Sequence, residues 1–291
     1  MSALQNLERP TAPYNVEDLS PRRIVNGRKR GFETKEDAAA EDVLRAKMLT
    51  KFASGRTDRL GRDAADLANR LAGDRPPRTL ASARFMREMR IRFTGTLLKL
   101  AAPWPDKDLR FFTGLSSRWE IRAKDLRNLD PSKLKEQLRS QLNRAGAKDA
   151  DGFLIAIFEA EFEPVRGVYL FHVHGLAAAG MIGVLGELHG LEAYRSRPDV
   201  RKPLQMNKLK KDKSRAEAFS YLLKSYWQQR RLVPVADVRK PKRERQPHRL
   251  DEPHHTKSLL FIDRVELSSF VLLMKCECKH RTLVLTTKSN K

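Results

Sequence analysis

The stretch "YLFHVHGLAAAG", from Tyr169 to Gly180, decides the fold that the sequence predicts. Its apolar residues predict a strand inside a β-sheet, but it also holds His172 and His174, separated by one valine. Residues i and i+2 of a strand point to the same face of the sheet. The two imidazoles are therefore expected side by side, at a spacing that suits two ligands of one divalent ion.

A second apolar strand is predicted just before the histidines, at "GFLIAIFEAEFEP" (152–164). Glutamates at alternate positions place three carboxylates on one of its faces: Glu159, Glu161 and Glu163. The short loop "EPVRG" predicts that the two strands form an antiparallel hairpin. A buried carboxylate must be paired or bound to metal, whereas an exposed one is simply solvated. We expect Glu161 to be the third metal ligand, with its neighbour Glu159 as the alternative.

Further elements are predicted on both sides of the hairpin. "LRFFTGLSSRWEI" (109–121) is rich in aromatic residues and predicts a strand. "DPSKLKEQLRSQLNRAG" (130–146) and "SRAEAFSYLLKSYWQQRR" (214–231) have the apolar spacing of helices. The predicted fold is α+β, with a central antiparallel sheet, flanking helices and an additional N-terminal helical region.

Composition and proline content divide the chain into five predicted parts. Residues 1–33 are expected to be a flexible basic arm, and 34–105 three Arg-rich helices that form either a DNA-binding bundle or a cap. Residues 106–232 hold the predicted sheet, 233–256 a basic linker, and 257–291 C-terminal strands. No internal repeat is evident in the sequence.

The charge of the chain points to a polyanionic partner. With 58 lysines and arginines against 36 acidic residues, the formal net charge is +22. Residues 201–250 hold 16 basic and 4 acidic residues, a difference of +12, so more than half of the net charge lies there. Nucleic acid is the commonest partner of this kind. The basic residues expected to contact it are Lys208, Lys210, Lys211, Arg215, Arg230 and Arg231.

Membrane insertion and secretion are not expected. The sequence has no run near the roughly 18 apolar residues of a spanning helix, and its N-terminal segment lacks the pattern of a signal peptide. The two cysteines, Cys276 and Cys278, are too close for a good disulfide and are interpreted as strand thiols. These features predict a cytoplasmic protein.

The order of these motifs resembles a known family. The strand "FHVHGL", preceded by an acidic strand and followed by "YLLK", is similar to the HUH endonucleases, above all to replication initiators of rolling-circle plasmids and phages. The resemblance covers about residues 109–230. It implies that the histidines and a third polar ligand hold Mg²⁺ or Mn²⁺. It also implies that Tyr221 is the nucleophile, assisted by the catalytic Lys224 three residues later; Tyr226 is the alternative. The chain departs from the family at "TGLS" (113–116), where the family has Thr-Leu-Thr.

The function implied by this resemblance is metal-dependent, site-specific nicking and joining of single-stranded DNA through a 5′-phosphotyrosine. Such a reaction would start rolling-circle replication at an origin, with a host helicase and polymerase as further partners. A relaxase or transposase would use the same chemistry. The alternatives of other classes are a nucleic-acid-binding protein without catalysis and a zinc hydrolase.

Overall fold

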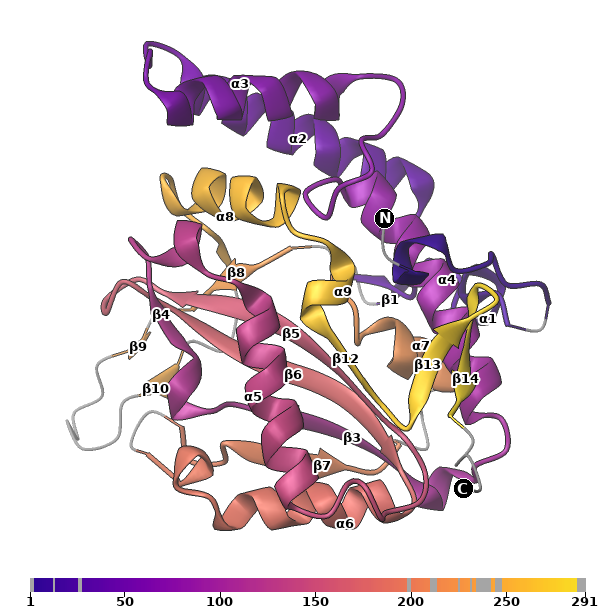
Figure 1. Ribbon diagram of the computed structural model, residues 1–291. Helices are drawn as coiled ribbons and strands as arrows, with labels where there is room; N and C mark the ends of the chain where they lie inside the picture. The colour runs from indigo at the N-terminus through magenta and orange to yellow at the C-terminus, as the bar shows by residue number, and fades with distance from the viewer. Residues whose placement is uncertain are drawn as a thin grey trace. The chain divides into compact units, whose positions relative to one another are not determined.

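The computed structural model describes residues 3–12, 14–25, 28–197, 200–209, 214–224, 226–230, 232–233, 242–243 and 248–286. The fold is α+β, with a mixed eight-stranded sheet and flanking helices (Figure 1). The chain divides into two compact units. The first comprises residues 1–98, 214–226 and 250–267, and the second comprises 99–213, 227–249 and 268–291. This division differs from the five consecutive parts predicted above, because the chain passes between the units several times.

The first unit is helical. Its longer helices are α2 (Lys35–Ala53), α3 (Arg59–Ala72), α4 (Ala83–Ala101, of which the last three residues belong to the second unit) and α8 (His254–Asp263). Short helices α1 (Val16–Leu19) and α7 (Arg215–Ser220) complete it. Thr34 precedes α2 and forms a capping box with Asp37. The Thr34 hydroxyl accepts a hydrogen bond from the backbone N–H of Asp37, and the Asp37 carboxylate accepts one from the backbone N–H of Thr34.

The N-terminal segment, predicted to be a mobile basic arm, packs against helices of the same unit. Residues Arg23–Val25 (β1) and Arg28–Arg30 (β2) form a hairpin. Leu7 and Val16 are fully buried, although prolines and charges surround them in the sequence. Glu17 forms an ion pair with Arg87 of α4. A few apolar side chains and ion pairs thus hold a segment whose composition is typical of a flexible arm.

The second unit contains the sheet. Along its main path the strand order is β11-β8-β5-β6-β3-β7, with β12 also paired to β5 and β4 also paired to β6. The strands are β3 (Leu109–Gly114), β4 (Glu120–Arg122), β5 (Leu154–Glu163), β6 (Val168–Ala178), β7 (Leu204–Asn207), β8 (Gln228–Gln229), β11 (His248–Arg249) and β12 (Val271–Met274). Each pairing is antiparallel except β5 with β8, so the predicted β5–β6 hairpin is confirmed.

One face of the sheet is covered by α5 (Pro131–Arg144), which lies across the strands in Figure 1. The Trp119 ring packs edge-on against Phe158 of β5, and its Nε1–H donates to Gln137 of α5 at 3.2 Å. The helix α6 (Gly180–Glu187) follows β6 directly. Because side chains alternate along a strand, Phe158 faces α5 while Glu159 faces the opposite side.

Glycine is required at position 175 of β6. A Cβ there would lie 2.3 Å from the ring of Phe112 in β3 and 2.3 Å from the carbonyl oxygen of Ile155 in β5. Both contacts are far shorter than real Cβ atoms allow, and the second is to backbone. Gly175 therefore permits the close fit of β6 between its two neighbours.

The helix predicted over 214–231 is much shorter in the structure. It forms only α7, which ends at Ser220 with Tyr221 as its C-cap. Farther on, Trp227 packs against Tyr169 and Phe171 of β6, and the next two residues form β8. Packing against the sheet thus overrides the local helix propensity of this segment.

The C-terminal part is a mixture of helix and strand. The range 257–291, predicted as strands, starts within α8 and continues with α9 (Leu267–Phe270). It then forms β12 and a hairpin of β13 (Cys276–Lys279) and β14 (Thr282–Leu285). Of the predicted basic linker, the structure describes two-residue strands β9 (Leu232–Val233), β10 (Lys242–Arg243) and β11, and the residues from 250 onward. Among the described residues, no helix combines the length and apolar character needed to cross a bilayer.

Candidate metal centre

The two histidines of β6 converge with one glutamate of β5. The Nε2 atom of His172 lies 3.6 Å from Oε2 of Glu159, and the Nε2 atom of His174 lies 3.5 Å from the same oxygen. The imidazole centroids are 4.8 Å apart, with the rings nearly perpendicular. All three ligand atoms lie within 4.8 Å of one another, and this is the one such group found among the described residues.

The strand register explains why Glu159 takes this place. In the β5–β6 ladder Glu159 pairs with His172, and Ile157 pairs with His174. Cross-strand partners point to the same face, so the carboxylate stands directly opposite one imidazole and diagonal to the other. The exposed fractions of the side chains of Glu159, His172 and His174 are 8%, 12% and 15%. A carboxylate this well buried is expected to have a cationic partner, which protonated histidine or a metal ion would supply.

Each imidazole is held at its other ring nitrogen. The Nδ1 atom of His172 lies 3.2 Å from the carbonyl oxygen of Leu170, and Nδ1 of His174 lies 3.0 Å from the hydroxyl oxygen of Thr113 in β3. Histidines that bind metals through Nε2 are usually oriented by such a hydrogen bond at Nδ1. The donor set and its surroundings therefore fit a divalent cation.

The other two glutamates of β5 have different partners. Glu161, which the sequence analysis expected as the third ligand, pairs with Arg230 at 3.0 Å. Glu163 accepts the backbone N–H groups of Val165 at 3.1 Å and Arg166 at 2.7 Å, and so stabilises the hairpin turn. The structure brings Glu159, the alternative considered, to the histidines instead of Glu161.

A signal for this register was present in the sequence. If the hairpin loop consists of the four residues 164–167, then Glu163 pairs with Val168, as the structure shows. Counting outward from that pair places Glu159 opposite His172 and Glu161 opposite Leu170. The alternation of side chains places all three glutamates on one face, but it does not by itself distinguish Glu161 from Glu159.

The candidate nucleophiles belong to the first unit. The group of Glu159, His172 and His174, called the metal cluster below, belongs to the second. Tyr221 is 58% exposed and directly follows α7. The Lys224 ammonium nitrogen lies 4.8 Å from the centroid of the Tyr221 ring, a cation–π arrangement. The alternative, Tyr226, is also exposed. The expected Tyr–Lys pair is thus in contact, but it is formed by a turn instead of by successive turns of a helix.

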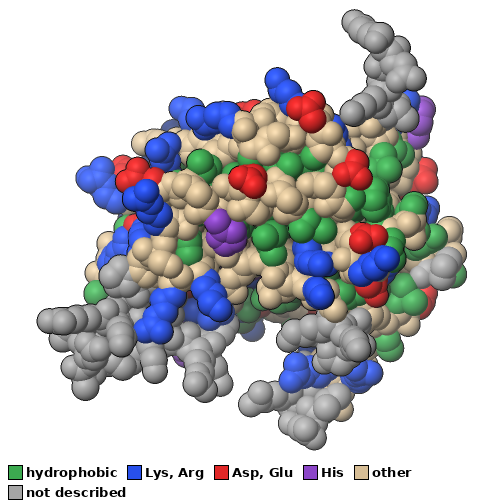
Figure 2. Space-filling model, turned by 90° about the horizontal axis from the view of Figure 1, so that it is seen from below, with side chains coloured by type: hydrophobic (Ala, Val, Ile, Leu, Met, Phe, Trp, Pro, Cys, Tyr) green, Lys and Arg blue, Asp and Glu red, His purple; other side chains and the backbone are tan. Residues whose placement is uncertain are grey.

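The basic residues predicted to bind DNA are distributed over both units. Lys208 is exposed just after β7, and Arg230 forms the pair with Glu161 beside the metal cluster. Arg215 is the first residue of α7 in the first unit. Lys210, Lys211 and Arg231 lie outside the described residues. On the face shown in Figure 2, lysine and arginine side chains occupy several separate places, interspersed with acidic ones.

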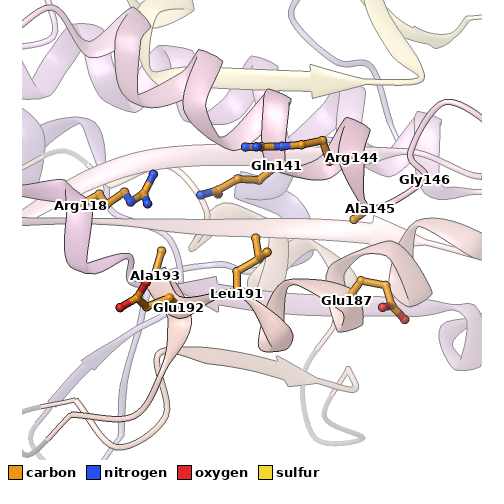
Figure 3. Close-up of a pocket in the computed structure, with 9 residues that line it drawn as sticks. All are labelled: Arg118, Gln141, Arg144, Ala145, Gly146, Glu187, Leu191, Glu192 and Ala193. Atoms are coloured by element: carbon orange, nitrogen blue, oxygen red, sulfur yellow. The ribbon is translucent and has the colours of Figure 1, made fainter.

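A cavity of about 630 Å³ lies on the α5 side of the sheet, on the opposite face from the histidines. Arg144 and Gln141 of α5 and Glu187 of α6 are among the residues that line it (Figure 3). Gln141 accepts a hydrogen bond from the Tyr194 hydroxyl at 2.9 Å. Burial raises the pKa of Tyr194 well above its usual value. This hydroxyl therefore stays protonated and serves the packing of the α5 face.

Fold and cluster together define the chain as an α+β protein with a candidate His₂Glu metal centre, on the face of a predominantly antiparallel sheet that lies opposite to α5. Comparisons with protein-family models, curated protein sequences and solved structures gave no match. The function is therefore argued from the site alone.

Proposed function

We propose that this protein nicks and rejoins single-stranded DNA by metal-dependent transesterification, with a tyrosine as the nucleophile. The observation that carries the proposal is the convergence of Glu159, His172 and His174, with both Nε2 atoms facing one carboxylate oxygen. Two neutral imidazoles and a carboxylate leave further coordination positions for a phosphate oxygen and water. Such an incomplete ligand set is typical of a catalytic site.

The proposed role of the cluster is to hold Mg²⁺ or Mn²⁺. When bound, the ion would withdraw charge from a scissile phosphate and fix its orientation. The residues around the cluster supply the rest of the environment. Arg230 directly follows β8, the strand adjacent to β5, and pairs with Glu161 at 3.0 Å. Its guanidinium can attract a phosphodiester. Leu170 and Thr113 hold the two imidazoles by their Nδ1 atoms.

Tyr221 is the proposed nucleophile. Its hydroxyl oxygen would form a bond to phosphorus while the bond from phosphorus to the 3′ oxygen breaks, and the phenolic proton would pass through solvent to that leaving oxygen. The products are a 5′-phosphotyrosine and a free 3′-OH, and the reverse reaction rejoins the strand. The Lys224 ammonium, 4.8 Å from the centroid of the Tyr221 ring, places a positive charge where the phosphodiester would approach. An exposed side chain suits this role, because its substrate is a macromolecule.

The charge of the chain supports a nucleic-acid substrate. A net charge of +22 favours binding to a polyanion through its phosphates. The resemblance of "FHVHGL" and "YLLK" to rolling-circle initiators extends the proposal to a biological role, the start of replication of a plasmid or phage-like element. A relaxase or a transposase would carry out the same chemistry on a different target.

The experiment is a search for a covalent protein–DNA adduct. The protein is incubated with a random pool of labelled single-stranded oligonucleotides and Mn²⁺, and the products are separated in SDS. We expect a band of reduced mobility that requires the metal and is absent in Tyr221→Phe. The matched variant Tyr226→Phe should retain it.

Other outcomes would change the assignment. An adduct that is lost in Tyr226→Phe, but not in Tyr221→Phe, would move the nucleophile to Tyr226. Metal-dependent cleavage that survives both substitutions would indicate a hydrolase. Tight DNA binding without adduct or cleavage would contradict catalysis and leave a nucleic-acid-binding protein.

A further inference from the structure

Thr113 lies in the segment "TGLS", at which the chain departs from the family that it resembles. It is the fifth of the six residues of β3, which is bonded to β6 on one side and to β7 on the other. In these ladders Thr113 pairs with His174 and with Gln205. Its side chain therefore stands on the same face of the sheet as the histidines.

The Thr113 hydroxyl oxygen lies 3.0 Å from Nδ1 of His174. The ring of His174 then presents its other nitrogen, Nε2, toward Glu159 at 3.5 Å. His172 is oriented differently, because its Nδ1 partner is a carbonyl oxygen of its own strand. Of the two histidines, His174 is thus the one whose observed Nδ1 partner is a side chain that a substitution can remove.

The surroundings of Thr113 hold its hydroxyl in one place. Pairing on both sides of β3 fixes its backbone. A Cβ-branched side chain has few accessible rotamers. The adjacent Phe112 packs against Gly175 so closely that a Cβ at that glycine would lie 2.3 Å from its ring, which fixes β3 against β6. The hydroxyl partner of His174 is therefore preorganised before any ion arrives.

We infer that Thr113 is a positioning residue of the metal centre: its hydroxyl accepts the Nδ1 hydrogen of His174 and so keeps Nε2 available to bind the ion. This inference rests on the metal centre of the proposed function. It does not depend on which tyrosine is the nucleophile or on whether DNA is cleaved. Losing such a partner typically weakens metal binding by about 10- to 100-fold.

The test is Mn²⁺ binding to the full chain, measured by calorimetry. Thr113→Val keeps the shape of the side chain and removes the hydroxyl, and we expect it to weaken binding by about 10- to 100-fold. Thr113→Ser retains a hydroxyl and should restore most of the affinity. The matched control is Thr96→Val, since Thr96 is buried and donates its hydroxyl hydrogen to a backbone carbonyl of α4, in the first unit. This control should bind Mn²⁺ like the unchanged protein.

A second measurement separates orientation from general damage to the fold. In the metal-free protein, ¹⁵N chemical shifts of the imidazoles report which nitrogen carries the hydrogen. We expect the Nδ1–H form of His174 to dominate in the unchanged protein and in Thr113→Ser, and a mixture of tautomers in Thr113→Val. A structural role alone would not produce this difference between valine and serine.

The possible results are distinct. Unchanged Mn²⁺ affinity in Thr113→Val, or equal losses in the valine and serine variants, would overturn the inference while leaving nicking intact. Weakened binding in Thr113→Val in a protein that forms no DNA adduct would support the inference and contradict the nicking function. If the unchanged protein binds no Mn²⁺, both the metal centre and the inference fail.

Discussion

Three glutamates lie on one face of β5, and each of them has a different kind of partner. Glu159 faces two imidazoles, Glu161 faces the guanidinium of Arg230, and Glu163 accepts two backbone N–H groups of the turn. Each carboxylate is nearly buried, and each has a partner that offsets the cost of burial. The alternation of acids in the sequence therefore marks a polar face, but each position on that face has its own partner.

At the residue scale, Glu159→Gln and Glu161→Gln are predicted to differ in metal binding. Replacing Glu159 removes an anionic ligand, and we expect the Mn²⁺ affinity to fall by about 100-fold or more, beyond the usual effect of an indirect partner. Replacing Glu161 leaves the three donor atoms in place, and the affinity should change little. Calorimetric titration of both variants, after circular dichroism has shown that each is folded, checks this. Equal losses in the two variants would contradict the assignment of Glu159.

At the scale of elements, local patterns predicted the parts of the site that depend on neighbouring residues. The hairpin of β5 and β6 and the helix α5 follow from alternation, turn residues and apolar spacing, and all three were expected. The strand β8 could not be predicted in this way, because Gln228–Gln229 pair in parallel with β5 over a long sequence separation. Identifying Glu159 as the third ligand required the register of the β5–β6 hairpin as well as the face on which the glutamates lie.

The helix α4 offers an element-scale prediction about stability. Asp42 of α2 is fully buried and accepts hydrogen bonds from the Ser82 hydroxyl at 2.8 Å and from Nε of Arg84 at 3.0 Å, where α4 begins. Removing one partner of a buried charge pair typically costs about 3–5 kcal/mol. We therefore expect Asp42→Ala to lower the free energy of unfolding by at least about 3 kcal/mol, as measured by urea denaturation.

The matched control for this prediction is Asp66→Ala in α3. Asp66 pairs with Arg70 at 2.9 Å, but its side chain is 68% exposed. Such surface pairs contribute about 0–1 kcal/mol, so the control should unfold almost like the unchanged protein. Similar decreases in the free energy of unfolding of the two variants would show that the buried contact at the start of α4 stabilises the protein no more than an exposed ion pair does.

At the scale of the whole molecule, the positive charge predicts steep salt dependence of DNA binding. For single strands the slope of log K against log salt concentration is about −0.7 per phosphate contacted. We expect Lys208→Ala to reduce the steepness by about 0.7, because Lys208 follows β7 at the edge of the sheet that carries the metal cluster. Fluorescence anisotropy across a series of salt concentrations measures the slope.

The control for salt dependence is Lys133→Ala. Lys133 is exposed on α5, the helix that covers the face of the sheet opposite to the histidines. Its loss should leave the slope unchanged. A slope that falls equally in both variants would mean that the charge acts as a diffuse field instead of through contacts near the metal cluster. A slope near zero in the unchanged protein would exclude nucleic acid as the partner.

The sheet that carries the metal cluster is assembled from three separate stretches of chain, 99–213, 227–249 and 268–291. Strands β8 and β12, which both pair with β5, come from the second and third of these stretches. A recombination event that transfers only the first stretch between genes would deliver β5 and the histidines without either of these neighbours. The complete sheet and the helical unit are thus expected to be inherited together, because any continuous segment that encodes the whole sheet also encodes residues 214–226 and 250–267 of the helical unit.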